Sequence, residues 1–184
     1  MIWLFVATDT GRSQSQQPSL TWLGTLGGAK SRAYGVSSDG RVVVGEAENA
    51  AGQRRAFRWT AGGGMEDLGT LPGYDASYAY GVSADGRVVV GAAANAAGRG
   101  RAFRWTAAGG MEDLNITYAS LLIPGSYLEQ AYAISPDGRY IVGQGYNAAT
   151  GRTEAFLLDT IPEPAGLLAL GMRLAGLLLC RRKR

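Results

Sequence analysis

RAYGVSSDGRVVVGEAENAAGQRRAFRWTAGGGMEDLGTLPG, residues 32–73, returns with few changes at residues 78–114 as YAYGVSADGRVVVGAAANAAGRGRAFRWTAAGGMEDL. The second copy begins 46 residues after the first, because Tyr78 stands where Arg32 stands. A third, more divergent copy, QAYAISPDGRYIVGQGYNAATGRTEAFLLD, covers residues 130–159. Self-similarity at a fixed period indicates a repeat architecture in which each repeat is one structural unit. The sequence therefore predicts a repeat domain over residues 20–160, with units at about 23–67, 68–113 and 114–160.

Each unit is expected to contain four short strands. An Asp-Gly dipeptide, such as Asp39-Gly40, separates AYGVS from RVVVG and supplies the positive φ angle of a tight hairpin. In RAFRWT the side chains alternate, so that Phe57 and Trp59 share one face of the strand. One face is then expected to pack, while the other meets solvent or a neighbouring unit. Glycines loosen the next turn, and residues 65–71 are predicted to form the fourth strand.

The fold class that this pattern indicates is all-β. We expect three four-stranded repeats of about 46 residues that form β-propeller-like blades, followed by a single C-terminal transmembrane helix. The alternative is a trefoil-like barrel in which the three units close with threefold symmetry. Three blades are few for a propeller, because such rings typically use four to eight. An array of this kind would associate with other copies, remain open, or close as the barrel.

The two ends of the repeat array look complementary. The third copy stops at AFLLDT, residues 155–160, without the GMEDLGTL that ends the first unit. LTWLGTLGG, residues 20–28, resembles such a final strand but has no unit before it. Repeat folds tend to remove unpaired strand edges, which are aggregation hazards. We therefore predict a clasp in which the N-terminal strand completes the last unit.

The distribution of charge argues against one class of partner. The chain has 18 basic and 15 acidic side chains, a net charge of +3. Residues 161–184 contain five of the basic side chains and one of the acidic ones, so residues 1–160 hold 13 and 14 and carry a balance of −1. The basic character thus belongs to the tail. We predict no nucleic-acid partner, because the body lacks the positive excess that such binding requires.

Two further features argue against common catalytic chemistry. The chain contains no histidine, which removes the most frequent general base and metal ligand. Its single cysteine, Cys180, allows neither an internal disulfide nor a CxxC metal site. Asp39, Asp85 and Asp137 recur once per unit, which favours a role in turns over an asymmetric active site. We expect a protein without enzymatic activity, cofactor or metal.

The units resemble the HAF repeats of bacterial extracellular proteins. The resemblance lies in YGVSxDGxVVVG, AFRWT and GGMxDLGTLGG, and it covers about residues 20–158. It implies β-propeller-like blades and a location outside the cytoplasm. The family's His-Ala-Phe triplet is replaced here by Arg-Ala-Phe at residues 55–57 and 101–103, and by Glu-Ala-Phe at residues 154–156. A role that depends on the histidine does not transfer, whereas Ala-Phe fits a role in packing.

The C-terminus, IPEPAGLLALGMRLAGLLLCRRKR, combines a rigid motif, an apolar stretch and a basic end. Residues 165–180 include seven leucines and would span about 24 Å as a helix at ~1.5 Å per residue, less than a hydrocarbon core of about 30 Å. Arg173 in the middle costs roughly 3 kcal/mol, so this transmembrane helix is marginal. A basic flank stays on the cytoplasmic side, which leaves the repeats on the other side. The flank consists of Arg181, Arg182, Lys183 and Arg184.

This order of elements is similar to the PEP-CTERM sorting signal of Gram-negative envelope proteins, over residues 161–184. By that resemblance Pro162, Glu163 and Pro164 form the recognition motif for an exosortase, a membrane enzyme that cleaves near it. The two prolines hold an extended segment, and Glu163 offers one carboxylate at the membrane boundary. Tails of the family have an uncharged centre, so Arg173 predicts inefficient processing. The alternative is a proline-rich linker before an amphipathic helix that packs on the body.

Export is implied by this resemblance. We expect an inner-membrane intermediate with a cytoplasmic C-terminus, and then a location at the cell surface or outside the cell. Export also demands an N-terminal signal, and MIWLFVATDT lacks the basic start and the longer apolar run of a secretory leader. Residues 1–19 are therefore expected to be an incomplete or missing signal peptide, followed by the polar linker GRSQSQQPS.

Two functions fit these features. The leading hypothesis is an exported, non-catalytic cell-envelope or extracellular-matrix protein, sorted by an exosortase, whose repeats serve structure, interaction or self-association. The alternative is a carbohydrate-binding module with exopolysaccharide as its ligand, in which tyrosine rings stack on sugars. The exposed tyrosines expected to do so are Tyr34, Tyr74, Tyr78, Tyr80 and Tyr146.

Overall fold

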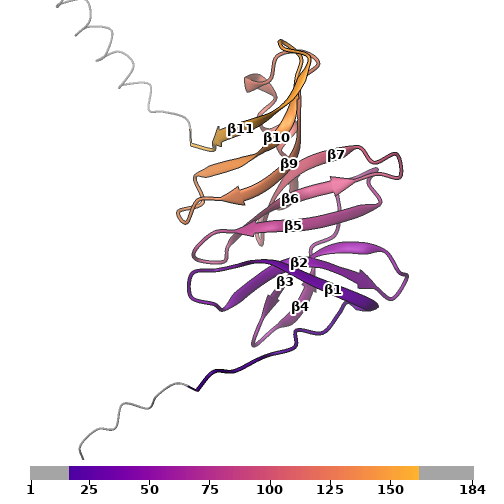
Figure 1. The fold of residues 1–184 in the computed structure, drawn as a ribbon, viewed down its shortest axis with the longest axis vertical. Helices are drawn as coiled ribbons and strands as arrows, with labels where there is room; N and C mark the ends of the chain where they lie inside the picture. Colours follow the sequence, from indigo (N-terminus) through magenta and orange to yellow (C-terminus); the bar gives the residue numbers. More distant parts are fainter. Residues whose placement is uncertain (1–16, 162–184) are drawn as a thin grey trace, which may run out of the picture.

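The computed structural model describes residues 17–161, which form three antiparallel sheets arranged one after another in chain order (Figure 1). Sheet 1 contains β1 (Gly27–Val36), β2 (Val42–Asn49), β3 (Arg54–Thr60) and β4 (Gly64–Asp67). Sheet 2 contains β5 (Ala76–Val82), β6 (Val88–Ala94), β7 (Gly100–Thr106) and β8 (Gly110–Asp113). Sheet 3 contains β9 (Tyr127–Ile134), β10 (Tyr140–Asn147) and β11 (Arg152–Asp159).

The prediction of an all-β fold built from three units is confirmed. Within each sheet the strands pair in sequence order, and none of the sheets among the described residues closes into a barrel. The trefoil-like alternative is therefore wrong. Two short helices, α1 (Leu114–Thr117) and η1 (Ala119–Leu121), form part of the connection between sheets 2 and 3. The Asp113 carboxylate caps α1 by accepting a hydrogen bond of 2.8 Å from the Asn115 N–H.

The first hairpin of every sheet turns on the same Ser-x-Asp-Gly motif. In sheet 1 the Asp39 carboxylate accepts hydrogen bonds from Ser37 Oγ (2.7 Å) and from the Arg41 N–H (3.0 Å). Ser37 Oγ in turn accepts one from the Val42 N–H (3.0 Å). Gly40 has a φ of 71°, in the left-handed region that favours glycine, so the Asp-Gly prediction is confirmed. The same contacts recur at residues 83–88 and 135–140.

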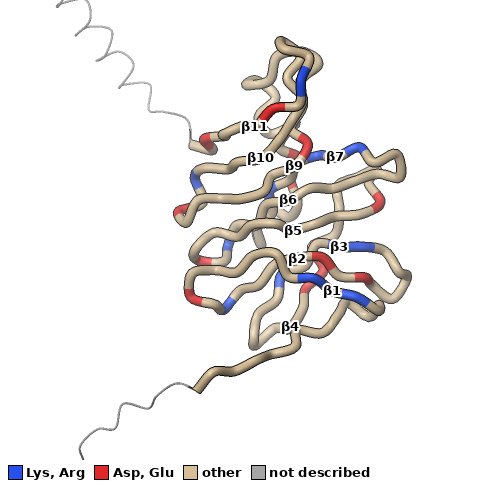
Figure 2. The backbone as a smooth tube through the Cα atoms, viewed as in Figure 1, with Lys and Arg blue, Asp and Glu red and all other residues tan. Residues whose placement is uncertain are grey.

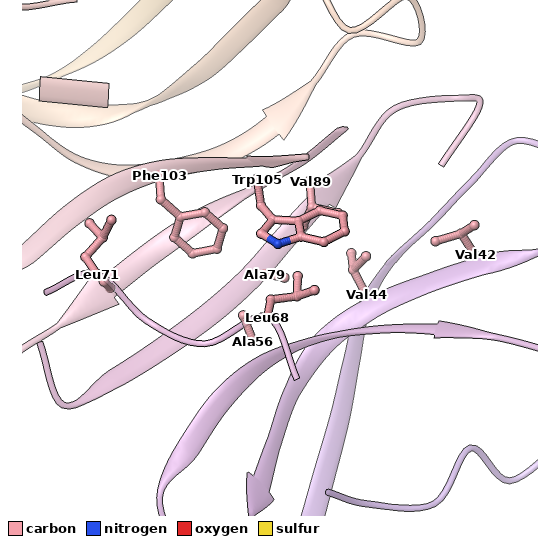
Figure 3. Close-up of a cluster of buried hydrophobic side chains, with 10 residues drawn as sticks. Val42, Val44, Ala56, Leu68, Leu71, Ala79, Val89, Phe103 and Trp105 are labelled. Atoms are coloured by element: carbon pink, nitrogen blue, oxygen red, sulfur yellow. The ribbon is translucent and has the colours of Figure 1, made fainter. Parts of the chain in front are cut away.

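Each sheet has two faces that carry different side chains. The front face is the one that bears Val44 and Ala56 in sheet 1, and it points toward sheet 2. The back face is the one that bears Phe103 and Trp105 in sheet 2, and it points toward sheet 1 (Figure 3). Leu68, from the connection between the two sheets, packs among these side chains. Burial of such apolar surface is the main force that holds adjacent sheets together.

The contact between sheets 2 and 3 has the same scheme. Val90 and Ala102, on the front face of sheet 2, pack with Ile141, Leu158 and the half-buried Phe156, on the back face of sheet 3. Sheet 2 is thus buried on both faces, between its two neighbours. The side of the RAFRWT strand that carries phenylalanine packs, as predicted. The opposite side contacts the next sheet, which is the second of the two environments expected for it.

A glycine permits a close approach at the same place in every sheet. A Cβ atom on Gly91 would lie 1.9 Å from the carbonyl oxygen of Tyr78 and 2.7 Å from Cζ of Phe103. Gly45 and Gly143 have the same surroundings, each with a carbonyl oxygen 1.9 Å from the ideal Cβ position. In each case the pairing of the first two strands shifts register close to the glycine. The glycine of VVVG is therefore required by a β-bulge, because no side chain fits there.

Among the described residues, sheet 3 has three strands instead of the predicted four, and two further details of the predicted arrangement are wrong. β4 ends at Asp67, and Leu68 and Leu71 lie in the buried connection to sheet 2 instead of extending the strand. The predicted clasp does not form within one chain either. Residues 17–25 belong to no strand and lie at the sheet 1 end of the molecule, whereas β11 lies at the opposite end (Figure 1). With two other sheets between them, these two segments cannot pair in one chain.

Candidate functional site

The predicted sorting signal and the predicted membrane span cannot be placed in this structure. Pro162, Glu163, Pro164, the apolar residues 165–180 and the basic residues 181–184 all lie outside the described residues. Among residues 17–161 no helix is long and apolar enough to cross a bilayer.

A row of tyrosines lies along the first strands of the three sheets. Tyr34 of β1, Tyr80 of β5 and Tyr132 of β9 occupy equivalent positions in the three repeats. Their ring centroids are 5.7 Å apart between Tyr34 and Tyr80, and 5.8 Å apart between Tyr80 and Tyr132. Tyr78 stacks on Tyr80 at 6.3 Å with an angle of 7° between the rings. These four residues, called the tyrosine row, present a continuous aromatic strip across all three sheets.

A buried carboxylate lies beneath one end of the tyrosine row. Glu46 of β2 is 4% exposed, and its Oε1 accepts hydrogen bonds from Arg32 Nη1 (2.6 Å) and from the Tyr34 hydroxyl (3.0 Å). Its other oxygen, Oε2, is buried and has no hydrogen-bond partner among the described residues. A buried acceptor without a partner is costly to a fold, and Glu46 is therefore an unusual residue at this position.

The hydroxyl groups of Tyr80 and Tyr34 stay protonated at physiological pH. Burial raises the pKa of Tyr80 to about 12, and the neighbouring Tyr78, Tyr34 and Tyr132 act in the same direction. Burial also raises the pKa of Tyr34, and its hydrogen bond to Glu46 adds to that effect. These two residues therefore offer neutral rings and hydroxyl groups that can donate hydrogen bonds.

A hollow surrounds Tyr127 at the start of β9, apart from the tyrosine row. The guanidinium of Arg101 lies 5.5 Å from the centre of the Tyr127 ring, and Arg101 Nε donates to the Tyr74 hydroxyl at 3.3 Å. Tyr146 stacks on Tyr127 at 5.6 Å. Tyr127 forms part of the wall of two adjoining cavities, one of about 520 Å³ that also includes Glu129 and one of about 410 Å³ with a largely apolar lining.

The structure divides the five predicted tyrosines between these two places. Tyr34, Tyr78 and Tyr80 come together in the tyrosine row, while Tyr74 and Tyr146 lie around Tyr127. Tyr34 is 45% exposed, and the other four are half-buried rather than fully exposed as predicted.

Sequence reasoning did not single out Tyr132, Tyr127 or Glu46. The signal for Tyr132 was present, because it aligns with Tyr34 and Tyr80 in the third repeat. Glu46 breaks the repeat pattern, since Ala92 and Gln144 occupy the equivalent positions in sheets 2 and 3. A residue that departs from its repeat is a better marker of a site than one that recurs.

Charged side chains of both signs lie at each place, so neither has an excess of one sign. Figure 2 shows basic and acidic residues interspersed along the strands and turns. Several form pairs across adjacent strands, such as Arg58 with Glu66 at 3.8 Å and Arg104 with Glu112 at 3.7 Å. Within the described part of the chain, no group of three or more acidic, histidine or cysteine side chains could hold a metal ion.

Comparison with known proteins gives only a coarse likeness. No family model matches the chain, and no curated protein matches it. A TolB-type protein from Agrobacterium tumefaciens is 19% identical with a TM-score of 0.48, over 69% of this chain and 42% of its own. TolB from Acinetobacter baumannii is 12% identical with a TM-score of 0.42, over 68% of this chain and 31% of its own. The chain spans less than half the length of either protein.

Proposed function

We propose that this chain is an exported, non-catalytic cell-envelope or extracellular-matrix protein that an exosortase sorts through its C-terminal motif. The observation that carries the proposal is the order Pro-Glu-Pro, apolar segment and basic end in residues 162–184. In the same proposal, the apolar segment spans the inner membrane and the basic end stays in the cytoplasm. The three sheets then lie outside and provide a surface for interaction.

The end of the folded body supports this proposal. Asp159, the last residue of β11, pairs with Arg139 through two hydrogen bonds of 2.8 and 2.5 Å. Thr160 donates its N–H and its hydroxyl to the Arg139 carbonyl, at 3.0 and 2.9 Å. The chain is thus anchored to the body up to two residues before Pro162. A processing enzyme would meet the motif immediately beside a folded domain, where the two prolines favour an extended backbone.

We further propose that the three sheets are blades of the β-propeller type. Two features of the structure support this architecture. Each sheet is an antiparallel meander of strands in sequence order, and adjacent sheets pack face to face. The first strands of adjacent sheets, β1, β5 and β9, also contact one another. Radial repetition of such sheets around an axis is the propeller plan.

Cell fractionation tests the sorting proposal. The full chain would be compared with a Pro162→Ala, Glu163→Ala double variant in a bacterium that carries an exosortase. We expect the original chain to appear as a shortened form outside the inner membrane, and the double variant to remain full-length in the membrane fraction. Pro72→Ala, which removes an exposed proline of the body, is the matched control and should be processed normally. Equal size and location for the double variant and the original chain would refute processing.

A second candidate function is the binding of carbohydrate by the tyrosine row. The observation that favours it is the strip of neutral rings, in which Glu46 holds the exposed Tyr34 in place through a hydrogen bond of 3.0 Å from its hydroxyl. Sugars present apolar faces that stack on aromatic rings and hydroxyl groups that donate to carboxylates. Exopolysaccharide is the ligand class with this chemistry that an envelope protein would meet.

A glycan array tests this second function. We expect Tyr80→Ala and Glu46→Gln to weaken saturable binding at least tenfold. Tyr140→Ala, which removes a tyrosine that belongs to neither the row nor the hollow around Tyr127, should leave binding unchanged. An array without saturable binding, or equal losses for all three variants, would rule out the tyrosine row as a sugar site.

A further inference from the structure

The internal repeat provides two examples of one interface, in which the front face of a sheet meets the back face of the next. Val44 of sheet 1 and Val90 of sheet 2 are equivalent front-face residues, and both are fully buried by the following sheet. Ala79 of sheet 2 and Ala131 of sheet 3 are equivalent back-face residues, and both are fully buried by the preceding sheet. Among residues 17–161, the third front face and the first back face have no such neighbour.

The front face of sheet 3 is apolar and open. Val142, the equivalent of Val44, is 41% exposed. Leu157 lies directly opposite it on β11 and is 69% exposed. Leu157 stands where Arg58 and Arg104 stand in the first two sheets, so this face is more apolar than its equivalents. Exposed apolar faces of this kind mark sites of interaction.

Part of the back face of sheet 1 is open as well, although Phe57 and Ala47 on that face are only 1% and 2% exposed. Ala33, the equivalent of Ala79 and Ala131, is exposed, and Val36 on the same face is 59% exposed. The turn at Gly40 has nothing within 4 Å of an ideal Cβ position. At the equivalent Gly86 an ideal Cβ would lie 2.4 Å from Cγ2 of Val42 in the preceding sheet, and at Gly138 it would lie 3.6 Å from Cγ2 of Val88.

Two hydrogen bonds in the first interface connect sheet 1 to the segment after it, and a third lies within that segment. The Ala56 N–H donates to Ser77 Oγ at 2.8 Å, and the Leu68 N–H donates to the Ala56 carbonyl at 2.9 Å. Ser77 Oγ also donates to the Gly69 carbonyl at 2.5 Å. One serine thus joins strand β3 to the connection and to β5.

The N-terminal segment reproduces half of this arrangement. Ser31, the equivalent of Ser77, donates from Oγ to the Gly24 carbonyl at 2.7 Å, just as Ser77 does to Gly69. Ser31 and Gly24 are exposed, and the half-buried Leu23 is the equivalent of Leu68. Residues 19–22 precede Leu23 as β4 precedes Leu68, and their apolar side chains Leu20 and Trp22 are 78% and 88% exposed. The segment has the form of a connection that lacks its preceding sheet.

We propose that the front face of sheet 3 in one copy docks on the back face of sheet 1 in a second copy. Residues 19–22 of the second copy lie beside β11 as the fourth strand of sheet 3. The Ala155 N–H of the first copy donates to Ser31 Oγ of the second, and the Leu23 N–H of the second donates to the Ala155 carbonyl. The clasp that the sequence predicts then forms between two chains.

Two copies joined in this way close on themselves. The contact is head to tail, and such contacts form either a closed ring or an open filament. Two chains of three sheets supply six, within the four to eight blades that propellers use, whereas three chains would supply nine. This closure rests on the propeller architecture proposed above, but it is independent of the sorting proposal.

Ala133 affects the distance between the first strands of the two copies. Gly35 lies so close to sheet 2 that a Cβ on it would be 2.9 Å from the Tyr80 carbonyl oxygen, and Gly81 approaches Cα of Ala133 to 3.1 Å in the same way. Ala133 occupies the equivalent position in sheet 3 and is exposed. Its methyl group holds the first strands slightly farther apart between copies. Ala133→Gly should therefore strengthen the association several-fold.

Light scattering of the purified full chain in detergent micelles tests the proposal. We expect a protein mass of about twice the 19.3 kDa of one chain. Val142→Asp should reduce it to one chain, because docking would bury an unpaired charge. Ile116→Asp, at a residue 77% exposed in the connection between sheets 2 and 3, is the matched control and should keep the doubled mass. A circular dichroism melt at low concentration checks that both variants fold.

Three outcomes would overturn the proposal. The original chain could have the mass of one copy, Val142→Asp could keep the doubled mass, or the mass could rise continuously with concentration, which would indicate a filament instead of a closed pair. The sorting variant Pro162→Ala, Glu163→Ala should keep the doubled mass. A chain that is not sorted but has the doubled mass would contradict the sorting proposal alone. A chain that is sorted but has the mass of one copy would contradict the docking proposal alone.

Disulfide trapping tests the register of the contact. Ser31→Cys and Ala155→Cys would be placed on separate chains, each with Cys180→Ser, and the chains would be mixed and oxidised. We expect covalent pairs only in the mixture, since positions 31 and 155 lie in sheets at opposite ends of one chain (Figure 1). Mixed chains that stay unlinked, while the original chain has the doubled mass, would overturn the proposed pairing of Ala155 with Ser31.

Discussion

Sheets 2 and 3 are built from the same repeat, yet their front faces have different environments. Val90 of sheet 2 is fully buried by sheet 3, whereas its equivalent Val142 is 41% exposed. Their back faces, by contrast, are both covered by the preceding sheet. The comparison shows that the burial of this valine depends on the neighbouring sheet rather than on the motif. The equivalent valines become core or surface according to whether another sheet packs against them, whereas Phe57 is 1% exposed although no sheet of the described residues precedes sheet 1.

The largest expected effect is at the phenylalanine of sheet 2. Phe103 is fully buried between sheets 1 and 2, and Phe103→Ala should lower the free energy of unfolding by about 3–5 kcal/mol because it leaves a large cavity. Phe156→Ala in sheet 3 should cost less, about 2 kcal/mol, because Phe156 is only half-buried. Urea denaturation of both variants measures the difference. Equal losses would mean that sheet 3 is as well covered as sheet 2.

The two equivalent valines should differ next. Val90→Ala should cost roughly 2 kcal/mol, because it removes buried methyl groups from the contact with sheet 3. In a dilute, single-chain sample Val142→Ala should change stability by less than about 0.5 kcal/mol, because its side chain is exposed there. Denaturation at increasing protein concentration sharpens the comparison. If the loss of unfolding free energy caused by Val142→Ala grows with protein concentration, it supports docking of a second copy. If that loss stays small and constant, it contradicts docking.

A smaller effect is expected at the turn serines. Ser83 is 2% exposed, and its hydroxyl bonds both Asp85 and the Val88 N–H. Ser83→Ala should cost about 1 kcal/mol, the contribution of a typical hydrogen bond in such a place. Ser135→Ala in sheet 3 should cost less, because water reaches Ser135 and replaces the lost bonds. Thermal melts of the two variants measure the difference. A larger loss of stability for Ser135→Ala than for Ser83→Ala would contradict this ranking.

The smallest effect concerns pH. Hydrogen bonds from the turn serines, and then from the N–H groups of the following arginines, hold the pKa values of Asp39, Asp85 and Asp137 below the ordinary value of 3.8. Each carboxylate therefore contributes stability above pH about 4, and that contribution disappears as the pH falls through the lowered pKa of the folded state. NMR titration of the aspartates should show all three pKa values below 3.8, and Ser37→Ala should raise that of Asp39 alone. An unchanged Asp39 value would remove the serine as the cause.

Much of the local structure could be predicted from the repeat. The Asp-Gly turns, the first three strands of each unit and the packing of the phenylalanine follow from alternation and turn chemistry, which act over a few residues. The fourth strand was predicted too long, because Leu68 and Leu71 continue an apolar pattern after β4 has ended. A connection buried between two sheets has the same pattern as a strand.

Less of the candidate site than of the fold could be predicted from the sequence. Tyr34 and Tyr80 come together because equivalent positions in successive sheets lie side by side, and Tyr78 joins them because it lies two residues from Tyr80 on the same strand. The sequence could not indicate that Glu46 lies buried beneath them, since its neighbours Arg32 and Tyr34 are set by the pairing of β1 with β2.

The sequence by itself determined the repeat, its hairpins and the glycine of each bulge, because these depend on the conformations that short stretches of backbone allow. Only the tertiary structure decided that the two ends of the repeat array lie apart and that, within residues 17–161, no sheet covers the first back face or the third front face. Pairing of distant segments depends on how successive sheets are oriented, and no local pattern records that orientation.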